Sequence, residues 1–454
     1  MGLDAEATGR RKAHHSRATD VITSISIQTW KSFRNAELPL APLTLMIGAN
    51  ASGKSNAIEG VRCLAWLADG RRLSEITSAV QEADQLIRGT VENLTHDAEH
   101  AFTLGCKTDD PDWNEYFIRV GVGAEGLRVT HEAITGPGSA VPLFNVYAPA
   151  DEFSHSLEVQ YNNFSRGGKK PRIPATDEQS VLSQLTTPAR FGAGHNKAQE
   201  IIPAVVERFR EALTRTLFLD PSPRRMRQYS FVVDNQLKDD GRNLSSVLYE
   251  LCERRGQKSA VLAFIRNLPE QDFQDITFLR TPRNEVMLQL TESFARRSQV
   301  WDAPVLSDGT LRVLAVAAAL LSAEEGSLVV IEEIDNGVHP SRAGMLLENI
   351  EQVANARGLR VLLTTHNPAL VDTLPPEATP DIVYCYRDPE DGDSRLVRLE
   401  DLSNYPELVA RGPLGQLMTR GILERMVKHP PSDEHRRKVA DQLLRSLADR
   451  VEAA

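Results

Sequence analysis

The segment GANASGKSN (residues 48–56) constrains the fold of this chain more than any other. A phosphate-binding loop needs backbone N–H groups that point at the phosphate, and glycines allow that approach where larger side chains would block it. The preceding LTLMIG (43–48) is predicted to be a strand, and SNAIEGVRCLAWLA (55–68) has the apolar spacing of a helix. Four residues have the spacing of such a loop: Gly48, Gly53, Lys54 and Ser55.

Strand, glycine loop and helix in this order predict a nucleotide site. In such a site Lys54 would lie against the β- and γ-phosphates, and the hydroxyl of Ser55 would be a ligand of Mg²⁺. The alternative is a chance match, which ordinary residue frequencies produce about once in a hundred chains of this length. The candidate nucleotide-binding residues of the loop are Gly48, Asn50, Ala51, Ser52, Gly53, Lys54, Ser55 and Asn56.

Two acids, Glu332 and Glu333, close the apolar segment SLVVIEE (327–333), which is predicted to be a buried strand. Two carboxylates at the end of a buried strand are costly unless a cation or a proton-transfer role compensates. Glu332 suits a ligand of Mg²⁺, directly or through water, and Glu333 suits the base that polarises an attacking water. The alternative is that both acids are simply exposed past the edge of the sheet.

The segment LSDGTLR (306–312) contains the start of a predicted helix (309–324), and Ser307 is a natural N-cap for it. The same hydroxyl and the free N–H groups could form a second anion site. Because the chain already has one phosphate loop, this second site would serve the γ-phosphate of a neighbouring molecule. His366 ends the predicted strand RVLLTTH (360–366), where a γ-phosphate sensor would be wanted, although a lone histidine there more often has a structural role.

Net charge, cysteine spacing and hydropathy bear on the cellular compartment and on the classes of partner. The net charge of −10 gives no global basic field that would attract nucleic acid. The four cysteines form no CxxC pair, which gives no sign of structural zinc and favours a reducing cytoplasm. The longest apolar run, VLAVAAALL (313–321), is too short to span a bilayer. We therefore expect a soluble cytoplasmic protein without a membrane partner.

The length of 454 residues suggests two or three domains. After residue 285, apolar strands alternate with helices, which predicts a parallel sheet covered on both faces. Between the two regular ends, strands are predicted within 102–132, and helices at 181–187, 201–219 and 244–256. We expect a disordered leader (1–19), a head built from 20–70 and 280–420, inserted strands and a helical arm (71–279), and a C-terminal helical tail (421–454).

The order of glycine loop, LSDG, apolar strand with two acids, and strand with TTH resembles the ATP-binding-cassette (ABC) type ATPases. It is most similar to the branch of chromosome-maintenance (SMC) and RecF-like heads, and within it to stand-alone bacterial AAA-family ATPases related to the OLD and Septu-type defence ATPases. IEEIDNGVHP (331–340) and TTHNPALVD (364–372) carry this resemblance, which covers most of residues 21–420. It implies an α/β P-loop NTPase fold, an ABC/SMC-like head with a long inserted α+β or helical arm.

The resemblance also implies roles for individual residues. Most cassettes have aspartate where Glu332 stands, and Asp308 replaces the first glycine of the signature. Because a carboxylate beside a γ-phosphate is repelled, we expect Asp308 to turn outward or to cap the helix. Gln184 is the candidate for the glutamine that helps to hold Mg²⁺. The implied roles are phosphate-loop lysine (Lys54), Mg²⁺ ligand (Ser55), Walker B acid (Glu332), catalytic glutamate (Glu333), signature (Ser307, Asp308, Gly309), interface loop (Asp335, Asn336, Gly337) and switch histidine (His366).

The resulting hypothesis is an ATPase with ATP and Mg²⁺ as cofactors, working as a homodimer or higher oligomer whose heads enclose ATP. It would be the switch or sensor of a bacterial antiviral defence system with a separately encoded, nuclease-like effector. The alternative is a DNA-maintenance ATPase that clamps nucleic acid, and a transporter cassette is a more distant one. Basic segments at 165–172, 207–215 and 223–228 could face nucleic acid, or could simply be solvated.

Overall fold

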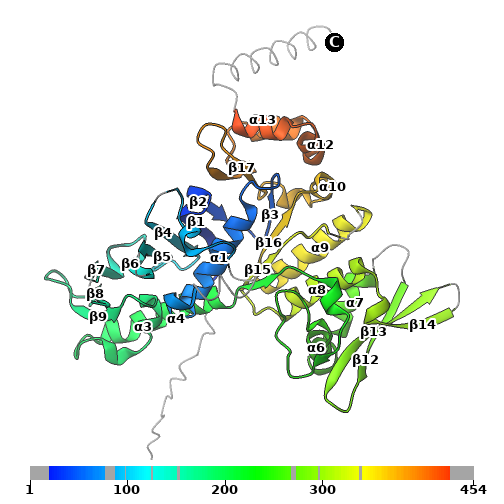
Figure 1. The fold of residues 1–454 in the computed structure, drawn as a ribbon, viewed down its shortest axis with the longest axis horizontal. Helices are drawn as coiled ribbons and strands as arrows, with labels where there is room; N and C mark the ends of the chain where they lie inside the picture. The colour runs from blue at the N-terminus through cyan, green and yellow to red at the C-terminus, as the bar shows by residue number, and fades with distance from the viewer. Residues whose placement is uncertain are drawn as a thin grey trace, which may run out of the picture.

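The computed structural model describes residues 20–76, 87–97, 99–123, 126–150, 154–266, 272–294, 297–336 and 340–429. The expected leader (1–19) and most of the expected tail lie outside these ranges. Within them the strands form three sheets, which are arranged side by side with the six-stranded sheet in the middle (Figure 1). No helix in the described part of the chain is long and apolar enough to cross a membrane.

The central sheet has the order β10-β15-β16-β3-β17-β18, and its first five strands are parallel. β18 pairs antiparallel with β17. The short apolar strands at its centre are wholly buried, as parallel strands covered on both faces must be. The predicted parallel sheet is thus confirmed. Its strands are β3 (Leu43–Ile47), β10 (Leu217–Leu219), β15 (Leu328–Ile331), β16 (Arg360–Thr365), β17 (Val383–Arg387) and β18 (Ser394–Arg398).

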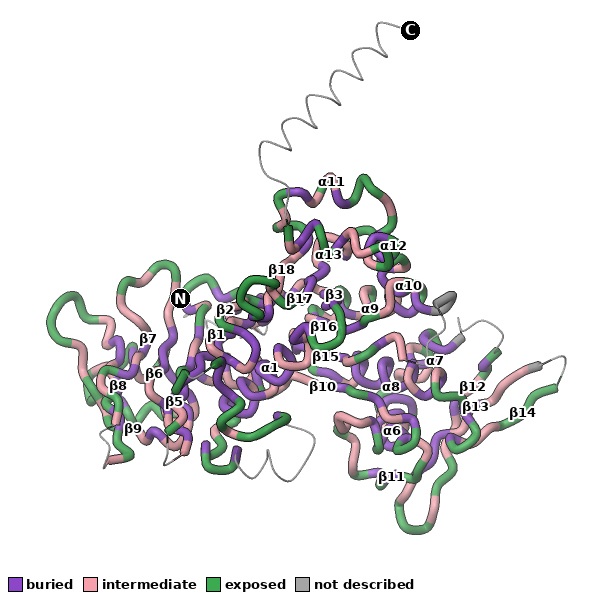
Figure 2. The backbone as a smooth tube through the Cα atoms, turned by 45° about the horizontal axis from the view of Figure 1, so that its top comes forward, coloured by how far each residue is buried: buried purple, intermediate pink, exposed green. Residues whose placement is uncertain are grey.

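Two apolar cores cover the two faces of this sheet. Leu45 of β3 joins a core with α8 and α9, whereas its neighbour Met46 joins a second core with α1. Successive side chains of a strand point to opposite faces, so β3 connects both cores. Figure 2 shows the buried backbone concentrated along α1, α8 and these central strands. The covering helices are α1 (Lys54–Ala68), α8 (Asp308–Ser322) and α9 (Pro340–Arg357).

An antiparallel sheet of eight strands lies on the α1 side of the central sheet (Figure 1). Its order is β2-β1-β4-β5-β6-β7-β8-β9. Strands β4 to β9 therefore continue the sheet that β1 and β2 begin, so residues 101–176 do not form an arm separate from the N-terminal strands. The strands are β1 (Ile22–Trp30), β2 (Phe33–Pro39), β4 (Ala101–Thr108), β5 (Glu115–Gly123), β6 (Gly126–Gly136), β7 (Ser139–Ala148), β8 (Ser156–Tyr161) and β9 (Arg172–Thr176).

A third sheet, β11-β13-β12 with β14 paired to β13, lies on the other side with α6 and α7 (Figure 1). The last helices, α10 to α13, follow β16 and β18. The strands of the third sheet are β11 (Ser230–Phe231), β12 (Asp272–Arg280), β13 (Glu285–Phe294) and β14 (Arg297–Asp302). The remaining helices are α3 (Val181–Gln184), α4 (Asn196–Thr214), α5 (Pro223–Met226), α6 (Leu244–Tyr249), α7 (Lys258–Arg266), α10 (Pro368–Val371), α11 (Tyr405–Ala410), α12 (Leu414–Thr419) and α13 (Ile422–Lys428).

The helix predicted at 201–219 was wrong at its C-terminal end. α4 ends at Thr214, and Leu217–Leu219 form β10, which pairs in parallel with β15. Pairing with a neighbouring strand overrides the local helical pattern here, because the edge of the central sheet offers hydrogen-bonding partners that a helix end does not. The helix predicted at 244–256 is α6 followed by a π-helical turn, and the one predicted at 181–187 is a single turn.

A buried carboxyl group ties the outer sheet to that single turn. The side chain of Glu132 on β6 is fully buried and accepts hydrogen bonds from the N–H groups of Val181 and Leu182 (2.6 and 2.7 Å) and from the hydroxyl of Tyr116 (3.1 Å). Burial raises the pKa of Glu132 to about 7, although these hydrogen bonds act in the opposite direction. The group therefore couples folding to pH.

We expect Glu132→Gln to change how stability depends on pH. As the pH rises from about 4.5 to about 7, the unfolded chain loses the proton that folded Glu132 keeps, so the free energy of unfolding falls, by up to about 3 kcal/mol from this residue. Glutamine does not titrate. The melting temperature of the wild type minus that of the variant should therefore decrease between about pH 5 and pH 8. Differential scanning fluorimetry across this range would contradict the prediction if the difference stays constant.

Candidate nucleotide-binding site

The loop between β3 and α1 lines a cavity of about 370 Å³ at the carboxyl edge of the central sheet. The structure brings the phosphate loop together there with both acids after β15 and with the end of β16. Residues 307–309 and Gln184 are not among the residues that line it. The cavity is lined by Asn50, Ala51, Ser52, Gly53, Lys54, Ser55, Asn56, Ile58, Arg88, Glu332, Glu333, Thr364, Thr365, His366 and Arg387.

The glycines let the loop pack closely against β17 and β18. A Cβ atom on Gly48 would lie 2.1 Å from the carbonyl oxygen of Cys385, and one on Gly53 would lie 2.4 Å from Oγ of Ser394. Gly53 also has a φ of 120°, which side chains disfavour. These two positions therefore require glycine for the path of the loop as well as for the approach of a phosphate.

Lys54 is held by the loop itself. Its Nζ donates hydrogen bonds to the carbonyl oxygens of Gly48 (2.6 Å) and Ala49 (3.0 Å), and burial lowers its pKa. The hydroxyl of Ser52 is buried and has no hydrogen-bond partner among the described residues. A desolvated cation beside an unsatisfied hydroxyl at a helix N-terminus suits a phosphate, so these residues fit a bound nucleotide.

Glu332 follows β15 directly, and its backbone N–H donates to the carbonyl oxygen of Leu219 on β10 (2.9 Å). Its carboxylate lies 3.6 Å from the guanidinium of Arg62 on α1. Burial raises the pKa of Glu332 while the charge of Arg62 lowers it. A partly desolvated carboxylate at this edge fits a role in holding a divalent cation.

Glu333 has a left-handed backbone conformation, with a φ of 48°. Such a conformation is strained for a residue other than glycine and is held in place by the surroundings. The hydroxyl of Thr364 accepts a hydrogen bond from its N–H (3.0 Å), and the side-chain amide of Asn336 donates to its carboxylate. The carboxylate is thus held by the loop that follows β15.

The end of β16 completes the edge of the cavity. The hydroxyl of Thr365 donates to Asp335 (2.6 Å) and accepts from the N–H of Asn367 (3.0 Å), which fixes the turn after β16. His366 lies between these two anchored residues, is exposed and lines the cavity. His366 thus reaches the cavity from the carboxyl end of β16, and its role as a γ-phosphate sensor stays a prediction.

Gln184, expected as a ligand of Mg²⁺, lies elsewhere. Its side-chain amide donates to the carbonyl oxygen of Thr176 (2.9 Å) and accepts from the N–H of the same residue (2.8 Å). Its neighbour Ser183 packs against Gly70, just beyond the C-terminal end of α1. Ser55 is at the other end of this 15-residue helix, about 20 Å away at 1.5 Å per residue. Gln184 is therefore not a ligand at this site.

Asp220 is the acid that the sequence analysis missed. It follows β10 directly, and because Leu219 pairs with Ile331, Asp220 and Glu332 leave the sheet beside each other. Both acids line one cavity of about 340 Å³ with Ser55. Removal from water raises the pKa of Asp220, and the charge of Glu333 raises it further. The signal in the sequence was LFLD, an apolar run followed by an acid, as in VVIEE.

The signature residues lie outside the cavity. The hydroxyl of Ser307 caps α8 by accepting a hydrogen bond from the N–H of Thr310 (3.1 Å). Asp308 turns outward, with 63% of its side chain exposed, and pairs with Arg227. Within the described residues of one chain, the N-terminus of α8 and the phosphate loop therefore do not form one site.

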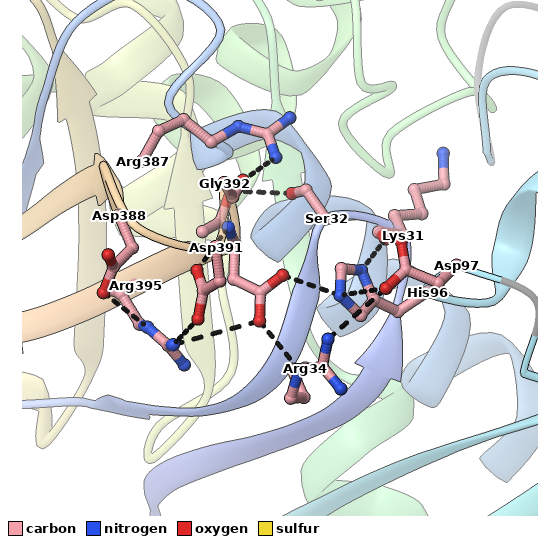
Figure 3. Close-up of polar contacts among 12 residues, drawn as sticks. Lys31, Ser32, Arg34, His96, Asp97, Arg387, Asp388, Asp391, Gly392 and Arg395 are labelled. Carbon is pink, nitrogen blue, oxygen red and sulfur yellow. Dashed lines mark hydrogen bonds and ion pairs between the residues drawn. The ribbon is translucent and has the colours of Figure 1, made fainter.

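A third cavity, of about 510 Å³, adjoins the 370 Å³ cavity of the phosphate loop and shares Asn56 and Arg387 with it. Figure 3 shows the polar network on its wall. Nε2 of His96 lies 2.7 Å from Oδ1 of Asp393, and Nε of Arg34 donates to Oδ2 of the same carboxylate (2.9 Å). Removal from water would raise the pKa of Asp393. The hydrogen bond from Arg34 and the nearby positive charges outweigh this effect and hold that pKa below its usual value. This wall is therefore polar, and its carboxylate is paired on both oxygens.

The sequence matches, over residues 43–372, the family described as "AAA domain, putative AbiEii toxin, Type IV TA system". An ATP/GTP phosphatase of Helicobacter pylori (strain ATCC 700392 / 26695) is 21% identical over 372 residues, which cover 78% of this chain and 87% of that protein.

Solved structures also match. The SMC head bound to the C-terminal winged-helix domain of ScpA has a TM-score of 0.43 and 12% identity, over 83% of this chain and 97% of that chain. The SMC head domain of Thermotoga maritima has a TM-score of 0.40 and 13% identity, over 83% and 98%.

We expect Lys54→Ala to abolish the binding of ATP, because it removes the cation of the phosphate loop and the two hydrogen bonds that hold the loop. Isothermal titration calorimetry with ATP and Mg²⁺ measures the effect, and a melting curve without nucleotide shows whether the variant is folded. A folded Lys54→Ala protein with the affinity of the wild type would contradict the assignment.

Asp220→Asn should raise the Mg²⁺ concentration needed for half-maximal ATP hydrolysis, by about tenfold. In the wild type, that concentration should fall as the pH rises, because protons compete with the cation for two carboxylates whose pKa values are raised. Mg²⁺ titrations of hydrolysis and of the binding of a fluorescent nucleotide measure both effects. Asp240→Asn, in the same cavity but paired with Arg225, is the matched control. An Asp220→Asn protein with unchanged Mg²⁺ requirement would remove this residue from the site.

Proposed function

The chain belongs to this AAA-domain ATPase family, and we propose that it is a nucleotide-dependent switch in which two copies close around two molecules of ATP. The observation that carries the proposal is the separation of two parts of one site. The phosphate loop and its acids line one cavity, whereas Ser307 and the N-terminus of α8 lie outside it. A second copy would bring its α8 to this cavity.

The residues of the cavity would have different roles in hydrolysis. Lys54 and the N–H groups of the loop would bind the phosphates of ATP. Ser55, Glu332 and Asp220 would hold Mg²⁺, which neutralises phosphate charge when it is bound. Glu333 would orient a water molecule and accept its proton, so that the water oxygen attacks the γ-phosphorus and ADP leaves.

His366 extends from the end of β16 into the same cavity and would donate a hydrogen bond to the γ-phosphate. Asn336 at present holds the carboxylate of Glu333, and Asp335 beside it is anchored by Thr365. A contact that a second copy makes to this loop would therefore reach the catalytic carboxylate through one hydrogen bond. Such an arrangement makes hydrolysis depend on the closed dimer, which is what a switch requires.

The switch would act in bacterial defence, with a separately encoded effector. The description of the family names a toxin–antitoxin system, which is by definition a system of two components, and this supports a partner. The relative in Helicobacter pylori, an ATP/GTP phosphatase, supports nucleotide hydrolysis as the source of the conformational change.

A nucleic-acid clamp is less well supported by the basic segments. Arg225 pairs with Asp240 (2.7 Å), and Arg227 binds the loop before α8. Arg208 pairs with Asp110, and Arg172 with Glu158. These guanidinium groups are engaged within the chain, so they form no ready surface for a phosphate backbone.

Glu333→Gln should trap a dimer that forms only with ATP and Mg²⁺, because nucleotide binds but the proton acceptor is lost. Turnover should fall by about 100-fold or more. Sedimentation velocity with ATP, with ADP and without nucleotide measures the association. The double variant Lys54→Ala/Glu333→Gln should stay monomeric under all three conditions. A Glu333→Gln protein that binds ATP and remains monomeric would refute the dimer.

A further inference from the structure

Arg227, which directly follows α5, binds the loop in front of α8 through its guanidinium group. Nε of Arg227 donates to the carbonyl oxygen of Pro304 (3.2 Å), and Nη2 donates to that of Leu306 (2.9 Å). The same Nη2 donates to Oδ1 of Asp308 (2.6 Å). One side chain thus binds three consecutive parts of a segment that is about 80 residues away in sequence.

This contact affects the charge at the N-terminus of α8. Asp308 occupies the first turn of α8, where a carboxylate is favourable because of the helix dipole. A γ-phosphate that approaches the same helix end would meet this negative charge and be repelled. Arg227 cancels that charge, and its remaining donors fix the loop that carries Ser307.

We infer that Arg227 is a positioning residue of the interface between two copies, required because the signature contains an acid. It neutralises Asp308 and orients Ser307 and the α8 N-terminus toward the γ-phosphate of ATP bound to the partner copy. The inference rests on the proposed ATP-enclosing dimer, since only there does a phosphate reach this helix. The nucleotide bound by the chain's own phosphate loop is not affected.

A purely structural contact makes a different prediction. Arg227 is mostly buried and Asp308 mostly exposed, with 27% and 63% of their side chains accessible. If Arg227 served only to hold the loop, its loss would lower the stability of the fold. Removing the charge of Asp308 would then not restore the dimer. If it serves to cancel a charge that opposes the phosphate, removing the charge of Asp308 makes Arg227 dispensable.

The test measures ATP-dependent dimerisation of Glu333→Gln protein by sedimentation velocity, with binding of a fluorescent ATP analogue as the second readout. Adding Arg227→Ala should weaken the dimer by about tenfold or more and leave the affinity of the monomer for nucleotide unchanged. Arg227→Gln, which keeps a donor near the position of Nε but carries no charge, should also weaken it. Adding Asp308→Asn to Arg227→Ala should restore most of the dimer.

Arg224→Ala is the matched control, because Arg224 is exposed on α5, three residues before Arg227, and makes none of these three contacts. Melting temperatures identify any variant that fails to fold, and in that case Arg227→Gln with and without Asp308→Asn decides. If Arg227→Ala and Arg224→Ala have the same effect on ATP-dependent dimerisation, the inference about Arg227 is overturned while the proposed function stands. A failure of Asp308→Asn to rescue a folded Arg227 variant would overturn it as well. A Glu333→Gln protein without any ATP-dependent dimer would overturn the proposed function, and the inference with it.

Discussion

A cluster of buried hydroxyl groups behind the phosphate loop is the interaction on which the site depends. Oγ of Ser394 donates to the carbonyl oxygen of Ser52 (2.6 Å) and accepts from the hydroxyl of Ser32 (2.8 Å), which in turn accepts from the side-chain amide of Asn56 (2.8 Å). The loop is therefore clamped between the β1–β2 turn and the β17–β18 hairpin, which are about 360 residues apart. Without this backing, a glycine-rich loop would lose its preorganised N–H groups.

The direction of the strands in the central sheet determines which side chains lie opposite the phosphate loop. Because β10, β15, β16 and β3 all run in the same direction, their carboxyl ends meet at one edge. Asp220, Glu332 and His366 each follow one of these strands, so three segments from distant parts of the chain supply side chains to adjoining cavities. A strand of only three residues is enough to place Asp220, since direction and register alone fix where its side chain starts.

The sequence was sufficient where the site is local and insufficient where it depends on pairing. Lys54, Ser55 and the two acids after β15 could be predicted, because a strand and the residues that follow it are read from one continuous pattern. Asp220 was missed although LFLD ends in an acid as VVIEE does, because the helical spacing of 201–219 continues through β10 and only the pairing with β15 makes this segment a strand. The position of Gln184 in the sequence does not reveal its hydrogen bonds to Thr176, and the contact of Asp308 with Arg227 joins residues about 80 positions apart.

The groups that would act on ATP are already bound to the protein itself. Lys54 donates to carbonyl oxygens of its own loop, and the carboxylate of Glu333 accepts from Asn336. Binding of a phosphate therefore exchanges hydrogen bonds at Lys54, which costs little reorganisation. Release of Glu333 needs a change in the loop that holds Asn336, and in the proposed dimer this loop is near the second copy. In the proposed dimer, nucleotide and partner would thus control different groups, so that neither alone would complete the site.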